Sequence, residues 1–406
     1  MILKKINNSL SIVFLTLFLD KLGENIVYPL LPFILAAYKP SAFMLGLIAS
    51  VGTFFSVLTG PLIGSLSDAL GRRLMILACI ALNMISLLMF GFAGSLPVIL
   101  FSRALYGVSI SAMGTLQAYI VDVSKPENRS RNLGISGAAF GMGAIGGPAL
   151  GSGLMGLGLN VPIFVAAALS GYNLLSATFF LKETIPAADR KKPNFATINI
   201  FKPITQLLRQ KTLNRIALGF AAFNIGFSAY INLLILALKN QYNWTPIQTS
   251  GLLIIVGVSL TVAQLFLIGK AVQAWGEFRV NRIGMLLAAG GILLLALAPV
   301  MGALTTTSVV LSGMILALGS AFVVPTSRSL VSGLVPSSQQ GAILGSLASL
   351  TGVSSVIGPI AAGALYDITP LACFAFEALT CITGAVLLGR NPSRDTTMED
   401  KASLHP

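Results

Sequence analysis

Long apolar runs separated by short polar stretches make up most of the chain. A helix needs about 20 residues to cross a hydrocarbon core of ~30 Å, and each run is long enough to do so. Because lipid offers no partner to backbone N–H and C=O groups, such runs are stable there as helices. The pattern predicts twelve transmembrane helices, at residues 9–37, 42–66, 74–94, 97–121, 131–155, 161–181, 213–238, 245–268, 280–301, 304–327, 338–365 and 369–389. The expected fold class is an all-α membrane protein.

One polar segment is much longer than the others and divides the twelve helices into two groups of six. It carries seven basic and two acidic residues. We therefore expect four parts: an N-terminal six-helix bundle at 1–181, a cytoplasmic linker at 182–212, a C-terminal six-helix bundle at 213–390 and a cytoplasmic tail at 391–406.

The two halves share glycine spacings. An offset of 205 residues aligns Gly46 with Gly251, Gly52 with Gly257, Gly64 with Gly269 and Gly71 with Gly276. An offset of 211 aligns Gly134 with Gly345, Gly147 with Gly358 and Pro148 with Pro359. Matches at constant spacing indicate a duplicated six-helix unit. The copies differ in charge, and Asp68, Arg72 and Arg73 correspond to Gln273, Glu277 and Phe278.

Composition agrees with this interpretation, since 55% of residues are hydrophobic, 10% are charged and the mean hydropathy is +0.86. A net charge of +13 would suggest a nucleic-acid partner in a soluble protein. Here 22 of the 26 basic residues fall in the termini and alternate loops, against two in the other loops and two in helices. This asymmetry predicts that both termini are cytoplasmic, and that the basic excess meets anionic lipid and not nucleic acid. Cys79, Cys373 and Cys381 lack ligand spacing, so we expect no metal site.

Three ionisable residues, Asp20, Lys21 and Glu24, lie near the middle of the first helix. A charged group there costs ~2.5 to 3.5 kcal/mol on insertion scales, so the cluster needs a purpose. The two carboxyl groups are four residues apart on one face and repel each other, which favours binding of a proton. The alternative is a structural network in which Lys21 pairs with Glu24 and Arg103 pairs with Asp20.

A polar loop follows the second helix and reads Gly64-Ser-Leu-Ser-Asp68-Ala-Leu-Gly71-Arg72-Arg73. Gly71 can take the positive φ of a tight turn, Asp68 can cap the next helix, and the two arginines place positive charge at a membrane face. The pattern G-x-L-x-D-x-x-G-R-R resembles the loop between the second and third helices of the major facilitator superfamily.

That resemblance implies two six-helix bundles around a central cavity, with this loop as a cytoplasmic gate. Asp122, at the end of the fourth helix, and Arg131, at the start of the fifth, are within reach of the loop. By resemblance, Asp68 would also cap the eleventh helix and so latch the two bundles together.

Two further motifs support the resemblance. Phe101-Ser-Arg103-Ala-Leu-Tyr-Gly107 is similar to motif B, R-x-x-x-G, whose arginine is thought to take part in proton transfer; a purely structural arginine is the alternative. The fifth helix has ten glycines in 25 residues. Its segment Gly143-Ala-Ile-Gly-Gly147-Pro148-Ala-Leu-Gly151-Ser resembles the antiporter motif, which ends in Gly where this chain has Ser. The motif implies exchange of substrate for protons, whereas close helix packing alone would also explain the glycines.

The first helix, with Leu19-Asp20-Lys-Leu-Gly and Pro29-Leu-Leu-Pro32, resembles that of tetracycline and multidrug efflux pumps. The sequence Leu181-Lys-Glu183-Thr is similar to the end of their sixth helix. Tetracycline pumps carry an acidic residue midway along the third helix, where this chain has Asn83 and Ser86. Tetracycline is therefore an unsafe choice of substrate.

We expect a proton-coupled exporter of small amphipathic compounds, a monomer in the bacterial plasma membrane, driven by the proton gradient without a cofactor. An exporter of a sugar, metabolite or lipid is the alternative, and a receptor or membrane-embedded enzyme is more remote. Glu377 is an isolated acid in the second half, with either a function or a structural bond. The candidates for the lining of the substrate cavity are Asn83, Met113, Gln117, Asn173, Phe223, Asn224, Phe227, Tyr230, Asn232 and Gln264.

Overall fold

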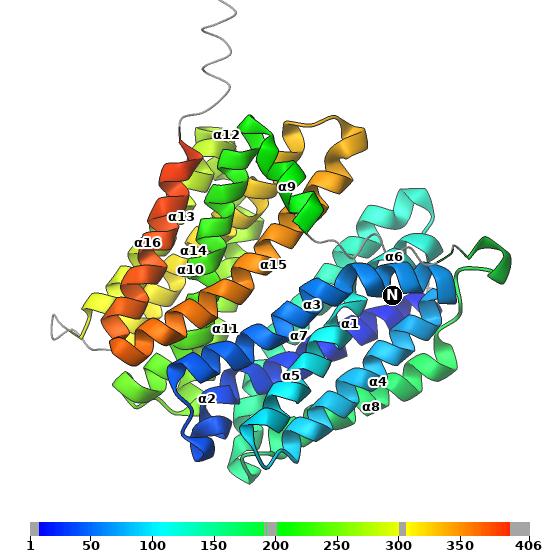
Figure 1. Cartoon of the computed structure of the whole chain (residues 1–406), viewed down its shortest axis with the longest axis horizontal. Coiled ribbons are helices and arrows are strands. Elements are labelled where there is room, and N and C mark those ends of the chain that lie inside the picture. The colour runs from blue at the N-terminus through cyan, green and yellow to red at the C-terminus, as the bar shows by residue number, and fades with distance from the viewer. Residues whose placement is uncertain (1–7, 191, 193–200, 300–305, 390–406) are drawn as a thin grey trace, which may run out of the picture. The chain divides into compact units, whose positions relative to one another are not determined.

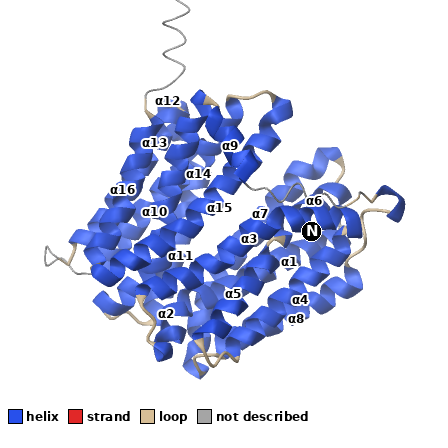
Figure 2. Cartoon of the chain, viewed as in Figure 1, coloured by secondary structure: helices blue, strands red, loops and turns tan. Residues whose placement is uncertain are grey.

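The computed structural model describes residues 8–190, 192, 201–299 and 306–389. All regular structure within these residues is helical (Figure 2). The expected all-α fold is confirmed. The predicted tail, and the basic residues Lys4, Lys5, Lys191, Arg390, Arg394 and Lys401 used to predict the topology, lie outside the described residues.

The first half begins with a helix that ends in shorter helical pieces. Its elements are α1 (Asn8–Val27), η2 (Tyr28–Leu30), α2 (Leu31–Ile34), η3 (Leu35–Tyr38), α3 (Ala42–Leu70), α4 (Arg72–Gly91), α5 (Leu96–Ile110), α6 (Ala112–Val123), η4 (Pro126–Asn128), α7 (Arg129–Leu154), η5 (Met155–Leu157), α8 (Val161–Phe180) and η6 (Ala187–Asp189). Pro29 and Pro32 explain the break after α1, because proline donates no backbone hydrogen bond and clashes with the preceding turn.

The second half contains α9 (Phe201–Arg209), α10 (Lys211–Tyr242), α11 (Pro246–Val262), the π-helix η8 (Ala263–Leu267), α12 (Ile268–Trp275), α13 (Glu277–Leu297), α14 (Thr306–Gly333), α15 (Ser337–Ile368) and α16 (Pro370–Leu388). In the described part of the chain, eleven helices are long and apolar enough to cross a membrane. The remaining helix of this length is α1, which carries the three charged residues noted above. Twelve spans agree with the prediction from the apolar runs.

The chain divides into two compact units, one of Met1–Ile200 and Asn232–Gly257 and one of Phe201–Ile231 and Val258–Pro406. In the first unit, α1 packs against α7 and α8, while α4 packs against α5 and α8 (Figure 1). In the second unit, α13 packs against α14 and α16, and α15 contacts α16 and α9. The charged part of α1 therefore lies among neighbouring helices.

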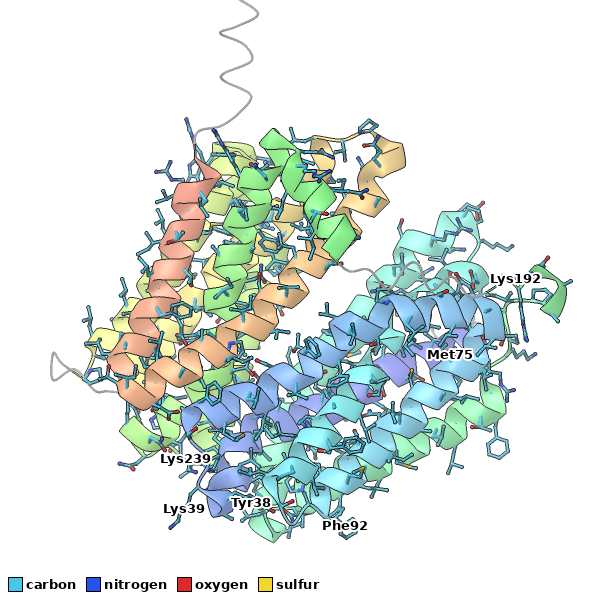
Figure 3. The ribbon with its side chains drawn as sticks, in the orientation of Figure 1. Tyr38, Lys39, Met75, Phe92, Lys192 and Lys239 are labelled. Carbon is cyan, nitrogen blue, oxygen red and sulfur yellow. The ribbon has the colours of Figure 1, made fainter. Side chains whose placement is uncertain are left out.

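Figure 3 labels side chains from the two ends of the first unit. Met75 and Lys192 lie at one end, and Tyr38, Lys39, Phe92 and Lys239 lie at the other. At the second end, the Lys239 ammonium donates a hydrogen bond to the Pro32 carbonyl oxygen (2.7 Å). At the first end, the buried Tyr119 hydroxyl donates to the carbonyl oxygen of Lys182 (2.7 Å), which holds the start of the linker against the bundle.

Candidate functional site

The first unit contains two adjoining cavities, of about 220 and 140 Å³, beside the charged segment of α1. Both are lined by Glu24, Asn83 and Tyr106, and the larger is also lined by Asp20 and Lys21. The remaining wall of the larger cavity is mainly apolar and consists of Leu17, Ile76, Cys79, Ile80, Ser109, Ile110, Ala112, Met113, Leu116 and Phe140. Each cavity is smaller than the ~300 Å³ or more of a drug-sized site.

Lys21 and Glu24 form an ion pair inside this site. The Lys21 ammonium donates to Glu24 Oε2 at 2.8 Å, and it also lies 4.5 Å from the centre of the Phe140 ring. The two side chains are 19% and 30% exposed, so the pair is largely removed from water. The spacing of three residues in a helix predicted this pair, which matches one part of the structural network considered from the sequence.

Asp20 has a different partner from the one considered in that network. Its Oδ1 accepts a hydrogen bond from the Asn173 amide of α8 at 3.3 Å. The Asn173 side-chain oxygen in turn accepts a hydrogen bond from Thr16 on α1 (2.9 Å). The acid that the sequence singled out is thus held by a neutral amide.

Arg103 lies against aromatic rings. Its guanidinium carbon is 4.5 Å from the centre of the Phe90 ring and 5.1 Å from that of Tyr106. The residue is 8% exposed, and its Nε and Nη2 atoms have no hydrogen-bond partner among the described residues. One turn further along α5, Gly107 allows a close approach of α3, because a methyl group there would meet the backbone of Gly52. Contact with the faces of aromatic rings does not use the N–H donors of the guanidinium. These donors remain available to a ligand or to a carboxylate.

The glycine ridge of α7 brings the backbone of α1 unusually close. A methyl group at Gly143 would come within 2.6 Å of the Phe18 carbonyl oxygen, and one at Gly147 would lie 2.5 Å from the Asn25 Cβ. At Gly151 it would meet the carbonyl of Ile26. Pro148 is buried beside this ridge within α7. This glycine ridge therefore packs α7 closely against the helix that carries the charged cluster.

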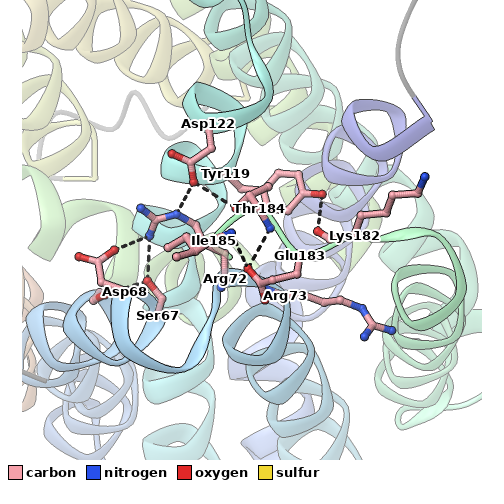
Figure 4. A network of polar contacts seen from close by, with 11 residues as sticks. Ser67, Asp68, Arg72, Arg73, Tyr119, Asp122, Lys182, Glu183, Thr184 and Ile185 are labelled. Carbon is pink, nitrogen blue, oxygen red and sulfur yellow. Dashed lines mark hydrogen bonds and ion pairs between the residues drawn. The ribbon is translucent and has the colours of Figure 1, made fainter. Parts of the chain in front are cut away.

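The polar loop between α3 and α4 forms a separate network at one end of the unit (Figure 4). Arg72 pairs with Asp68 (2.9 Å) and with Asp122 of α6 (2.7 Å), and it donates to the Ser67 hydroxyl (3.0 Å). Ser67 donates to the carbonyl oxygen of Gly64 (2.7 Å). Arg72 thus connects the end of α3 to the end of α6.

Glu183 caps α4, a role that the sequence analysis assigned to Asp68. The backbone N–H groups of Arg72 and Arg73 donate to the two Glu183 carboxylate oxygens at 2.9 and 3.2 Å. Asp68 cannot reach these groups, because it lies within α3 and its carboxylate binds the Arg72 side chain. Gly71, with φ +108°, makes the turn as expected. The one sequence signal for Glu183 was the likeness to the end of the sixth helix of efflux pumps.

Arg73 makes the reciprocal contact with α8. Its guanidinium donates to the carbonyl oxygen of Thr178 (2.7 Å) in the last turn of that helix. A cation at a helix C-terminus and a carboxylate at a helix N-terminus both oppose the local charge of the helix dipole. Arg131 is exposed at the start of α7 and is not among the residues that this network joins.

Three of the predicted cavity residues, Asn83, Met113 and Asn232, line the cavities described above. The others do not. Gln117 and Gln264 are exposed, and Asn173 is fully buried behind Asp20. Phe223 stacks with Phe220 and Phe227, Asn224 donates to the Phe220 carbonyl oxygen, and Tyr230 hydrogen-bonds with Ser312 (3.3 Å). The predicted residues of α10 between 223 and 230 therefore make packing and hydrogen-bond contacts within the second unit.

Glu377 is completely buried in α16. Its Oε1 accepts a hydrogen bond from the Cys373 thiol (3.4 Å), and its Oε2 has no hydrogen-bond partner among the described residues. It lines neither of the two cavities described above. Among the described residues, its one hydrogen bond is thus local, to a residue one turn earlier in α16.

Known proteins resemble the chain along almost its whole length. The family model of the Major Facilitator Superfamily matches residues 13–316 and 216–403. The class C tetracycline resistance protein of Escherichia coli is 28% identical, over 94% of this chain and 95% of that protein. The class G protein of Vibrio anguillarum is 30% identical, with the same coverage. Multidrug resistance protein 2 of Bacillus subtilis (strain 168) is 27% identical, again over 94% and 95%.

Solved structures show the same fold. The human organic anion transporter MFSD10 (TETRAN) has a TM-score of 0.69 and 24% identity, covering 94% of this chain and 99% of that chain. The nucleoside transporter NupG has a TM-score of 0.76 and 17% identity, covering 94% and 98%. At sequence identities of 24% and 17%, these structures show a shared fold and do not indicate a substrate.

Proposed function

The chain belongs to the major facilitator superfamily of membrane transporters, and we propose that it is a drug:proton antiporter that exports small amphipathic compounds by alternating access. The observation that carries this proposal is the Asp20 carboxyl, which lines a cavity next to the Lys21–Glu24 ion pair. Binding of a proton to either carboxyl changes the charge of the site by one unit. Such a change can favour one orientation of the transporter over the other.

The residues of the site give stronger support for proton exchange than for any particular substrate. Protonation of Glu24 would release the Lys21 ammonium, and Arg103 has donors ready for a carboxylate that loses its first partner. The mostly apolar wall of the larger cavity favours amphipathic compounds over a sugar, whose hydroxyl groups each need a partner. The tetracycline and multidrug resistance relatives are consistent with export of toxic compounds.

The energy available is sufficient. One charge moving through 100 mV gains ~2.3 kcal/mol, so a total driving force of ~150 mV supplies roughly 3.4 kcal/mol per proton. This free energy sustains a substrate gradient of about 300-fold. We further propose that the proton gradient is the sole energy source, that the protein acts as a monomer, and that both termini are cytoplasmic.

Expression in a pump-deficient bacterium, tested against toxic compounds of different charge, would identify a substrate. That compound is then added to energised inverted vesicles, where antiport should dissipate the pH gradient. We expect Asp20→Asn to abolish this dissipation, because the amide cannot take up the proton. Glu377→Gln is the matched control, since it changes a buried acid that lies outside the site, and should retain coupled transport.

Loss of proton coupling in the Asp20→Asn variant at normal expression supports the proposal. If Asp20→Asn and Glu24→Gln both kept full substrate-dependent dissipation of the pH gradient, the proton site would have to lie elsewhere. If the wild-type protein exported a compound without any effect on the pH gradient, antiport itself would be wrong.

A further inference from the structure

Asn173 connects Asp20 to Thr16, two α1 residues that are one helical turn apart. Thr16 Oγ1 donates to Asn173 Oδ1 at 2.9 Å, and Asn173 Nδ2 donates to Asp20 Oδ1 at 3.3 Å. Thr16 and Asn173 are 1% and 0% exposed, and neither lines the cavities. The carboxyl group thus faces a cavity and is supported from the protein interior by two polar side chains.

The Thr16 hydroxyl determines which end of the Asn173 amide faces Asp20. An amide has a donor end and an acceptor end, and a buried amide needs partners for both. Because Thr16 donates to the oxygen, the nitrogen is turned toward the carboxyl group. Without the hydroxyl the amide could turn around and place its oxygen against the carboxylate, which would be repulsive.

An N–H donor stabilises a carboxylate more than a neutral carboxylic acid. Hydrogen bonds to ionised groups are also roughly twice as strong as those between neutral groups. Asn173 therefore favours release of the proton from Asp20.

The other groups that line the two cavities and bear on this argument come from four helices. The charged and titratable ones are Lys21 and Glu24 on α1, Cys79 on α4, and Arg103 and Tyr106 on α5. From α7 the same cavity receives Phe140, which carries no charge. Substitution of Asn173 or Thr16 leaves all of these groups in place and removes hydrogen bonds that support the carboxyl group.

We propose that Asn173 is a positioning residue for the proton site, that Thr16 orients it, and that together they set the pH at which Asp20 exchanges its proton. This inference rests on the proposed role of Asp20 in proton coupling. It assigns to α8 a specific part in transport, in addition to packing against α1 and α4.

The experiment measures substrate-dependent dissipation of the pH gradient in vesicles over a range of pH. We expect Asn173→Leu, which keeps the branching of the side chain and removes the donor, to move the midpoint of this profile to higher pH by about 0.5 to 1 unit. Thr16→Val should shift it in the same direction by less, and Thr16→Ser should restore the wild-type midpoint. Thr16→Val should add nothing in the Asn173→Leu background, because the hydroxyl acts through the amide.

Ser170→Ala is the matched control. Ser170 is also a buried polar residue of α8, but its hydroxyl donates to the Ile80 carbonyl oxygen, so the midpoint should not move. An unshifted midpoint, or a shift to lower pH, in both Asn173→Leu and Thr16→Val would overturn the inference. Thr16→Val, which is close to isosteric, provides the test if Asn173→Leu does not fold. If Asp20→Asn abolishes coupling while these variants behave as wild type, this inference alone fails; if Asp20→Asn stays coupled, the proposed function fails.

Discussion

The α3–α4 loop and the α12–α13 loop are two copies of one turn that are held by different chemistry. Gly71 and Gly276 precede α4 and α13 with φ values of +108° and +77°. In the first copy, the helix N-terminus binds the carboxylate of Glu183. In the second copy, Glu277 lies in the first turn of α13 and accepts a hydrogen bond from Ser329 (2.6 Å).

The interhelical contacts beyond the turn differ in the same way. Arg72 uses charge to join α4 to Asp122 on α6. In the second unit, the buried Asn281 of α13 donates hydrogen bonds to Thr326 (2.8 Å) and Ser327 (2.7 Å) on α14. The turn itself needs glycine, because other residues rarely adopt such φ values. The side chains that fix the turn are under no such backbone constraint, so the copies could diverge.

The largest expected difference concerns the turn glycines. Gly71→Ala and Gly276→Ala should each lower the free energy of unfolding by ~1 to 3 kcal/mol, because alanine is strained at these φ values. At Gly71 the added methyl group would also meet the Glu183 carboxylate and lie 3.1 Å from the Arg190 guanidinium, whereas at Gly276 nothing is within 4 Å. We expect a clearly lower thermal midpoint for Gly71→Ala than for Gly276→Ala in purified protein. Equal midpoints would mean that the Glu183 cap contributes little.

The cap itself provides a smaller difference. Glu183→Gln removes the charge that opposes the α4 dipole and should cost ~0.5 to 2 kcal/mol. Amide hydrogen exchange in the first turn of α4 should become faster. Glu277→Gln is the comparison: it removes a charge in the first turn of α13 but no backbone cap, so exchange there should become faster by a smaller factor. Equal changes of the exchange rates in α4 and α13 would mean that the two turns do not differ in how their helix N-termini are capped.

The smallest difference is in salt dependence. Asp122 is 31% exposed, so its pair with Arg72 is partly screened and Asp122→Asn should cost ~0.2 to 1 kcal/mol at low salt. That loss should nearly disappear in about 1 M salt, where charges are screened beyond ~3 Å. Ser329→Ala removes the hydrogen bond to Glu277. It should lower the free energy of unfolding by a similar amount at low salt and in about 1 M salt. Salt-independent behaviour at Asp122 would show that Arg72 acts mainly by packing.

The helices could be predicted because crossing a membrane requires a continuous apolar run of a certain length. The Lys21–Glu24 pair could be predicted because both partners lie on one helix at a fixed spacing. Asn173 and Glu183 could not be assigned their contacts, since these depend on which helices are neighbours. Arg103 was matched with Asp20 on charge alone, and the aromatic faces of Phe90 and Tyr106 only become its neighbours in the folded bundle.

The hydrogen bonds of Glu183 show that the N-terminal bundle extends beyond the end of α8. Residues Glu183 to Ile185 fold back on one carboxylate, which is bound at the same time to the start of α4. A chain cut directly after α8 would leave α4 without its cap, and Asp122, the partner of Arg72, without its hydrogen bond from Thr184. For expression of the protein as two separate polypeptides, the first must extend past Ile185, so the beginning of the connection between the halves is part of the N-terminal bundle.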